Sequence, residues 1–194
     1  MVVVVKCRYS FMEAKMKLIS MLLVLAATLI LMGCDAPALL SLDPVVTAQD
    51  AAFDPTLLGT WGSDEDKDLC IFRRNGDNGY AITYVSDRSA RQFVARLFRV
   101  GESSMLDLTP EGTDEFQIAG HAVVRIWTKG GTLRWAYLDT EWLRQQASQL
   151  LPNRTDDKRV VLTAPGAAVR AFVAKYGVDD KAHGDTTEWQ RVQF

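Results

Sequence analysis

Three cysteines are the most nucleophilic side chains in the chain, and their positions limit the chemistry they can do. Cys7 precedes a long apolar run, Cys34 ends that run, and Cys70 belongs to the globular part that follows. Residues spaced in this way form neither an even-numbered disulfide framework nor the CxxC pattern of a metal site. We therefore expect Cys70 to be a small buried hydrophobic residue on a strand. Cys34 is the remaining thiol of interest, because it stands at the end of the apolar run.

The most acidic stretch carries Asp64, Asp66 and Asp68, which have the spacing of the first ligands in a calcium loop. The glycine that such a loop needs at its sixth position is replaced by Leu69. Its twelfth position holds Asn75 in place of the bidentate glutamate. The sequence therefore predicts a solvated turn here and no metal site.

Histidines and carboxylates that could serve acid–base catalysis lie far apart along the chain. His121 and His183 lack the HxxxH spacing of a zinc site, so each is expected to be structural or exposed. The polar segment 179–185 is predicted to be a loop, with closure over a cavity as the alternative. The sequence contains no G-x-S-x-G motif and no phosphate loop, and it predicts no catalytic residue and no cofactor. The isolated acids are Asp107, Asp139 and Glu141.

Aromatic residues are better placed for binding because several of them fall on predicted strands. They could line an apolar cavity, or they could equally fill a solid core. The second interpretation is favoured, since a barrel of about eight strands is just wide enough to be filled by side chains. The candidates are Tyr80, Tyr84, Phe93, Trp127, Trp135 and Tyr137.

The apolar run before Cys34 is typical of a secretory signal. It spans 18–32, interrupted only by Ser20 and Thr28, and is shorter than the roughly 20 residues of a spanning helix. Lys15 and Lys17 supply the basic region that precedes such a run.

The end of the run, Leu31-Met32-Gly33-Cys34, resembles the lipobox of bacterial lipoproteins. The resemblance implies cleavage between Gly33 and Cys34, diacylglycerol on the Cys34 sulfur and, in many bacteria, an acyl chain on the new amino group. Two or three acyl chains give stable membrane attachment. An uncleaved membrane anchor is the alternative. Residues 1–33 are thus predicted to be a signal peptide.

Two features near this signal carry further expectations. Asp35 resembles the residue that retains lipoproteins in the inner membrane of enteric bacteria, and the choice between inner and outer membrane stays open. Val2 to Val5 place an apolar patch ahead of the basic residues, which fits a signal peptide poorly. We therefore expect translation to start at Met12 or Met16.

Residues 34–52 are predicted to form a lipidated tether between the anchor and the folded domain. Pro37 and Pro44 interrupt regular structure there, and no clean hydrophobic period appears. The alternative is that Leu39, Leu40 and Leu42 pack on the domain or touch lipid.

A single β-rich domain is predicted over 53–194. Short runs that alternate with a period of two are separated by turn residues every 8 to 12 positions, which is typical of an antiparallel sandwich or barrel. A helix is expected over 141–151, where Asp139-Thr140 can cap the start. A second is expected after a cap at Thr163, with Pro165 in its first turn and Gly177 following its end. The expected strands are 58–61, 69–73, 80–85, 92–100, 104–108, 117–129, 132–138, 159–162 and 188–194.

The first of these strands, Leu58-Gly59-Thr60-Trp61, resembles the G-x-W signature of lipocalins and related calycin barrels. The resemblance implies an antiparallel barrel of about eight strands, here with two helices before the last strand. It also implies that Trp61 closes the barrel floor against an arginine from the far end of the chain, with Arg191 as first candidate and Arg125 as second. Another β-rich α+β form is the alternative fold.

Charge excludes one class of partner. The formal net charge of the 194 residues is −2, and it becomes −5 once the four basic residues and one acidic residue of the leader are removed. This balance indicates neither nucleic-acid binding nor a polybasic membrane patch. The sequence thus favours a lipid-anchored, periplasm-facing envelope protein, not an enzyme, that binds a small apolar ligand or lipid. An interaction module docking on an envelope protein complex is the alternative, and an enzyme is the third possibility.

Overall fold

The computed structural model describes residues 39–63, 67–86, 89–112, 120–155 and 159–193. The chain divides into two compact units, Met1–Ala36 and Pro37–Phe194, and the described residues belong to the second. The predicted signal peptide and the residues Gly33, Cys34 and Asp35 lie outside the described residues. Within the described ranges, no helix is long and apolar enough to cross a membrane.

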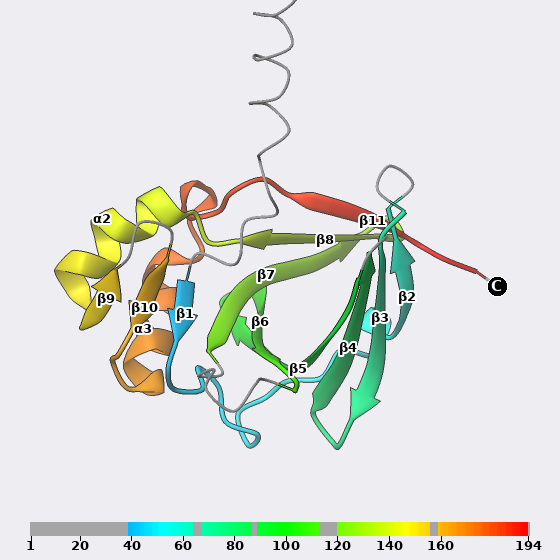
Figure 1. Cartoon of the computed structure of the whole chain (residues 1–194), viewed down its shortest axis with the longest axis horizontal. Helices are drawn as coiled ribbons and strands as arrows, with labels where there is room; N and C mark the ends of the chain where they lie inside the picture. Colours follow the sequence, from blue (N-terminus) through cyan, green and yellow to red (C-terminus); the bar gives the residue numbers. More distant parts are fainter. Residues whose placement is uncertain (1–38, 64–66, 87–88, 113–119, 156–158, 194) are drawn as a thin grey trace, which may run out of the picture. The chain divides into compact units, whose positions relative to one another are not determined.

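Eight antiparallel strands close into a barrel, which confirms the predicted lipocalin-like architecture (Figure 1). Their order is β6-β5-β4-β3-β2-β11-β8-β7, and the pairing of β6 with β7 completes the cylinder. The strands are β2 (Gly59–Gly62), β3 (Leu69–Asn75), β4 (Gly79–Ser86), β5 (Ser89–Val100), β6 (Ser103–Pro110), β7 (His121–Lys129), β8 (Thr132–Tyr137) and β11 (Thr187–Arg191).

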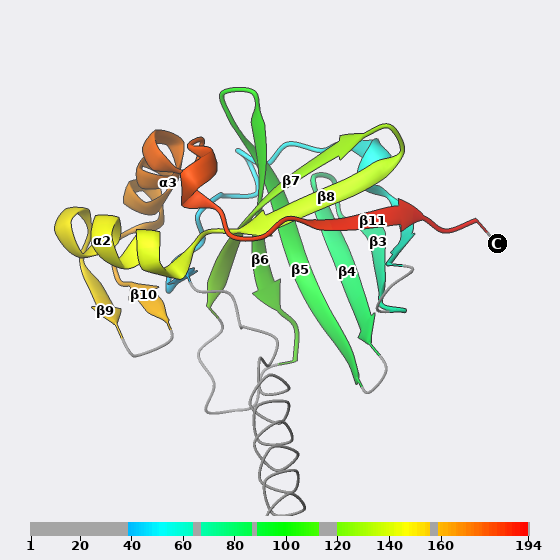
Figure 2. The same cartoon turned by 90° about the horizontal axis from the view of Figure 1, so that it is seen from above.

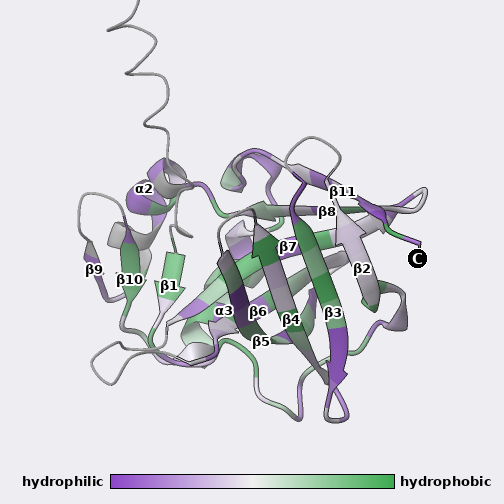
Figure 3. Ribbon diagram, turned by 45° about the vertical axis from the view of Figure 1, so that its right-hand side comes forward, coloured by the Kyte–Doolittle hydropathy of each residue, from purple (hydrophilic) through white to green (hydrophobic). Residues whose placement is uncertain are grey.

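Local sequence explains the hairpins of this barrel. Asn75 pairs with Gly79, and between them Gly76 has a φ of 64°, which glycine adopts without steric cost. Side chains then alternate, so that Tyr80 and Ile82 of β4 point into the barrel core. Figure 3 shows β3 changing from hydrophobic to hydrophilic along its length, because an apolar start is followed by Arg73 and Arg74.

The segment before Phe53 is part of the fold. β1 (Leu39–Ser41) pairs antiparallel with β7 and parallel with β10 (Val160–Leu162), which pairs in turn with β9 (Asn153–Thr155). Leu39, Val45 and Val46 are buried in a core shared with the helices. The predicted tether is therefore wrong for 39–52, and the domain begins before Phe53. Burial of these apolar side chains offsets the entropy of ordering the segment.

Two α-helices, α2 (Thr140–Leu150) and α3 (Gly166–Tyr176), precede β11 within the described part of the chain, as predicted. They lie beside β9 and β10 at one side of the barrel (Figure 2). Asp139 caps α2 by accepting a hydrogen bond from the Trp142 backbone N–H at 2.7 Å. The predicted cap at Thr163 is wrong, since α3 begins only after Pro165, which makes no side-chain cap. Two short 3₁₀ helices, η1 (Pro55–Leu57) and η2 (Asp180–Ala182), complete the elements of the described residues.

Candidate functional site

The floor of the barrel joins its first and last strands. The guanidinium of Arg191 on β11 lies 4.2 Å from the centre of the Trp61 ring on β2. Arg191 also donates hydrogen bonds to the carbonyl oxygens of Thr56 at 2.7 Å and Leu58 at 2.9 Å. Trp61 is 2% exposed, and its indole Nε1 donates to the Leu57 carbonyl at 2.9 Å. The pair thus holds η1 across this end of the barrel.

Gly59 makes the crossing of Arg191 possible. Its φ is 123°, a conformation that other residues rarely adopt, and a Cβ placed there would lie 2.6 Å from Nη1 of Arg191. The glycine of the G-x-W sequence therefore has a steric role. The second arginine candidate, Arg125, lies elsewhere: its guanidinium is 5.2 Å from the centre of the Trp127 ring and 2.8 Å from a carboxylate oxygen of Asp180.

Tyr80 anchors the segment just before η1 from inside the barrel. Its hydroxyl accepts a hydrogen bond from the Asp54 backbone N–H at 2.7 Å and donates to the Asp54 carbonyl at 3.1 Å. The Tyr80 ring is fully buried and stacks on Phe53, with ring centres 5.1 Å apart. Burial raises the pKa of Tyr80, which keeps the hydroxyl protonated and able to donate.

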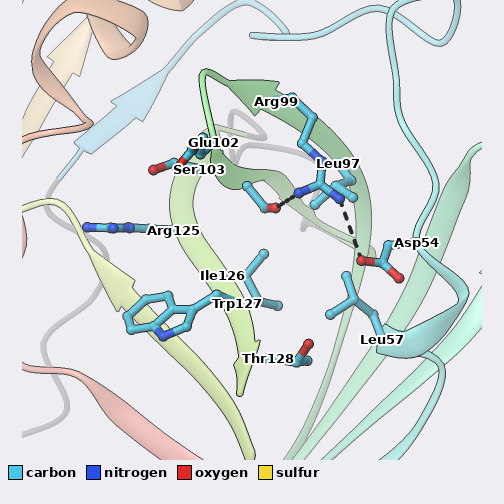
Figure 4. A pocket seen from close by; sticks show the side chains of 11 residues that line it. Asp54, Leu57, Leu97, Arg99, Glu102, Ser103, Arg125, Ile126, Trp127 and Thr128 are labelled. Carbon is cyan, nitrogen blue, oxygen red and sulfur yellow. Dashed lines mark hydrogen bonds and ion pairs between the residues drawn. The ribbon is translucent and has the colours of Figure 1, made fainter. Parts of the chain in front are cut away.

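A pocket of about 420 Å³ lies between η1 and the ends of β5, β6 and β7 (Figure 4). We call it the barrel-end pocket. Strand alternation explains its lining: Leu97 and Ile126 belong to the barrel core and form an apolar floor with Leu57. Polar side chains from the strand ends surround this floor. The full lining is Asp54, Leu57, Leu97, Arg99, Glu102, Ser103, Ser104, Arg125, Ile126, Trp127 and Thr128.

The predicted aromatic lining is mostly absent from this pocket. Of the six candidates, only Trp127 lines it. Tyr80 is part of the barrel core, and the other four pack against that core as partly buried residues: Tyr84, Phe93, Trp135 and Tyr137.

Four aromatic rings of three strands form a contiguous cluster in the barrel. Trp135 contacts Trp189 and Tyr137, with ring centres 5.1 and 5.6 Å apart, and Tyr84 stacks on Trp189 at 5.9 Å. The Tyr84 hydroxyl donates a hydrogen bond to a carboxylate oxygen of Asp68. These contacts make the cluster a packed part of the barrel.

Polar residues of the barrel-end pocket were missed by the sequence prediction. Asp54 caps η1, while Arg99 and Ser104 sit at strand ends; charged and hydroxyl side chains at such positions usually mark solvated turns. The alternation of β5 was the available signal, because Arg99 continues the inward face of Leu97.

Asp107, expected to be isolated, has partners on two other segments. One carboxylate oxygen lies 2.8 Å from Nδ1 of His121, and the other accepts the backbone N–H groups of Val45 at 2.8 Å and Val46 at 3.3 Å. The residue is 3% exposed. Both oxygens are thus occupied in fastening the N-terminal segment to β6 and β7, so the geometry stabilises the fold and offers no free carboxylate for catalysis.

The remaining candidates have structural partners. Glu141 is 4.0 Å from Arg144. His183 donates from Nε2 to the Gly177 carbonyl at 2.7 Å, and burial lowers its pKa. The predicted loop around His183 contains η2, whose Asp180 pairs with Arg125 at the pocket rim. Asp64 and Asp66 lie outside the described residues. In the part of the chain that the structure describes, no group of three or more His, Cys, Asp or Glu residues could hold a metal ion.

Comparison of the chain with protein-family models, with curated proteins and with solved structures found no match.

Proposed function

We propose that this protein is a lipid-anchored bacterial envelope protein whose barrel binds a small ligand with an apolar part in the barrel-end pocket. The observation that carries the proposal is the pocket itself. Its volume of about 420 Å³ falls in the range of small-molecule sites, toward the lower end. A short-chain molecule fits this volume better than a lipid with two full acyl chains.

The lining supports a ligand that is apolar at one end and polar at the other. Leu57, Leu97 and Ile126 offer an apolar floor on which a hydrocarbon chain can be buried. Hydroxyls of Ser103 and Thr128 at the rim can hydrogen-bond a polar group.

The proposed anchor fits a domain held close to a bilayer. Acylation of Cys34 would leave four residues before β1 begins at Leu39. A fully extended chain over these five steps reaches about 17 Å. This is shorter than a free tether of the predicted length would allow, because 39–52 are part of the domain.

The interaction module, the second sequence-based hypothesis, would be favoured by an exposed apolar patch or a long unpaired edge strand. In the described sheet, β9 at the edge is only three residues long. Among the described residues, the exposed large hydrophobic side chains are Leu42 and Val178. Two single residues do not form the contiguous patch that marks a docking surface. We therefore retain ligand binding as the proposal.

Native mass spectrometry of the lipidated protein, released from its host membrane, tests ligand binding. The Thr128→Trp variant places an indole in the pocket, and Thr186→Trp puts the same group at an exposed position outside the lining. We expect a bound small molecule on the wild type and on Thr186→Trp, and none on Thr128→Trp. Wild-type protein that carries no ligand and binds no fluorescent short-chain fatty-acid analogue would overturn the proposal.

Metabolic labelling with an alkyne-bearing fatty acid tests the anchor separately. We expect label on the wild type and none on Cys34→Ala, whose precursor should also keep its leader. A mature chain that begins upstream of Cys34 would contradict the lipoprotein assignment.

A further inference from the structure

We propose that the barrel-end pocket selects small amphiphiles with one anionic head group, a carboxylate or a phosphate monoester, and that Arg99 binds this head group. The inference rests on the proposed function, because it assigns the ligand class of the same pocket. It follows from the place of Arg99 in the pocket lining together with its spare N–H donors, whereas Arg191 and Arg134 have committed theirs to structural partners.

Arg99 is held in the pocket by its neighbours on two segments. Its Nη1 donates to the Ser104 hydroxyl, directly across the β5–β6 pairing, and its Nη2 lies 3.6 Å from a carboxylate oxygen of Asp54 (Figure 4). A separation of 3.6 Å is an ionic contact and is too long for a hydrogen bond. A guanidinium has five N–H donors. Arg99 thus uses one of them on the described residues, and 51% of its side chain is exposed.

Two other barrel arginines have their guanidinium groups occupied. Arg191 donates to two carbonyl oxygens and covers Trp61. Arg134 forms a two-pronged pair with Glu188, at 2.6 and 3.1 Å. Both have structural partners that an incoming anion would have to displace. Arg99 has the fork geometry that matches a carboxylate or phosphate and donors still available for it.

The two acidic residues near Arg99, Asp54 and Glu102, leave its remaining N–H donors available. One oxygen of Asp54 accepts the backbone N–H of Thr56 at 3.0 Å and its hydroxyl at 2.7 Å, so the carboxylate serves as the cap of η1. Glu102 lies at the β5–β6 turn, on the other side of the pocket from Asp54 (Figure 4). In the lining, the formal charges of Arg99 and Arg125 balance those of Asp54 and Glu102. Selection of an anionic head group therefore rests on directed N–H donors more than on net charge.

The floor and the head-group position together define the ligand's orientation. Arg99 lies two residues after Leu97 and on the same inward side of β5, so its guanidinium lies above the apolar floor of the pocket. An alkyl chain resting on Leu97 and Ile126 would bring its terminal anion to Arg99.

The test uses three ligands with one chain length, decanoate, decyl phosphate and decanol, on the full lipidated protein in nanodiscs. Affinities are measured by displacement of a fluorescent fatty-acid analogue. We expect both anions to bind at least tenfold more tightly than decanol. In Arg99→Gln this preference should fall to less than threefold while decanol affinity stays unchanged, which also shows that the pocket is intact. Arg73→Gln, an exposed arginine outside the lining, should behave as wild type.

The outcomes separate the inference from the proposed function. If none of the three ligands binds the wild type, the proposed function itself falls. If all bind with equal affinity, the pocket stands and the anionic selection is wrong. A preference that persists in Arg99→Gln places the anion elsewhere and overturns the role of Arg99. Tighter binding of decyl phosphate than decanoate, or the reverse, decides which head group the pocket prefers.

Discussion

Arg191 and Trp61 are cross-strand partners on β11 and β2, and the guanidinium of one covers the ring of the other at 4.2 Å. The contact connects the last strand of the barrel to the first. The same arginine holds two carbonyl oxygens of η1 and its C-terminal neighbour. One side chain therefore bridges the first and last strands of the barrel and fastens the segment that forms one wall of the pocket.

Replacing Arg191 by glutamine should lower the free energy of unfolding by about 1 to 3 kcal/mol. The loss combines the cation–π contact with two hydrogen bonds to carbonyl oxygens. Arg191→Lys should be destabilised by less, since it keeps the charge but lacks the fork. Chemical denaturation followed by tryptophan fluorescence measures the stability of both variants. An Arg191→Gln curve that coincides with wild type would show that the contact contributes no measurable stability.

Substituting Gly59 by alanine should destabilise the domain by about 1 to 3 kcal/mol. A φ of 123° strains any residue with a Cβ, and that Cβ would meet Nη1 of Arg191 at 2.6 Å. Gly184→Ala is the matched control, because a Cβ there meets no atom within 4 Å. Thermal unfolding of the two variants should differ clearly, and equal melting temperatures would refute the steric role of Gly59.

Removing the Asp107 carboxylate should loosen the N-terminal segment. Asp107→Ala leaves the backbone N–H groups of Val45 and Val46 without their acceptor, at a cost of about 2 to 4 kcal/mol. Hydrogen exchange should speed up at these two amides more than in the barrel strands. Asp77→Ala, at an exposed turn, should leave exchange of the segment unchanged. Unchanged protection in Asp107→Ala would show that packing alone holds the segment.

Stability should fall as the pH drops below the ordinary pKa of histidine, partly because of His183. Burial lowers the pKa of His183 from its usual 6.5, so the unfolded chain binds the proton more readily than the folded one. The stabilisation is therefore present above pH 6.5 and is lost as the pH falls toward the folded pKa. Among the described residues, its Nδ1 is buried without a hydrogen-bond partner. Denaturation midpoints between pH 8 and 5 should decline less in His183→Gln than in wild type, and parallel profiles would exclude His183 as the cause.

The Cys70 thiol should be inert until the domain unfolds. The residue is 2% exposed, and burial raises the pKa of its thiol far above the usual range. A thiol reagent such as DTNB should leave Cys70 unlabelled in the native protein and react with it once guanidinium chloride is added. Cys70→Ala should remove that reaction. Rapid labelling of native protein would mean that β3 opens locally.

Strands, turns and helices were predictable where the signal is local. The alternation around Tyr80 and Ile82, and the turn at Gly76, depend on neighbours within a few residues. Strand β9 was missed because it follows α2 directly and is only three residues long. The start of α3 was displaced from Thr163, since packing of the preceding chain outweighed the local capping preference.

Sequence alone determined the fold class: the alternation of two and the spacing of turns predicted an antiparallel sandwich or barrel. The G-x-W resemblance favoured the barrel and suggested that Trp61 and Arg191 lie on its first and last strands. Only the tertiary structure decided that Leu39 is a strand residue. Its partner is Val160, and the partner of the neighbouring Leu40 is Ala122; both lie far along the chain. The same holds for the pocket. Asp54, Arg99 and Thr128 come from separate segments. The hydrophobic periodicity of one segment does not reveal which other segments lie beside it once the barrel closes.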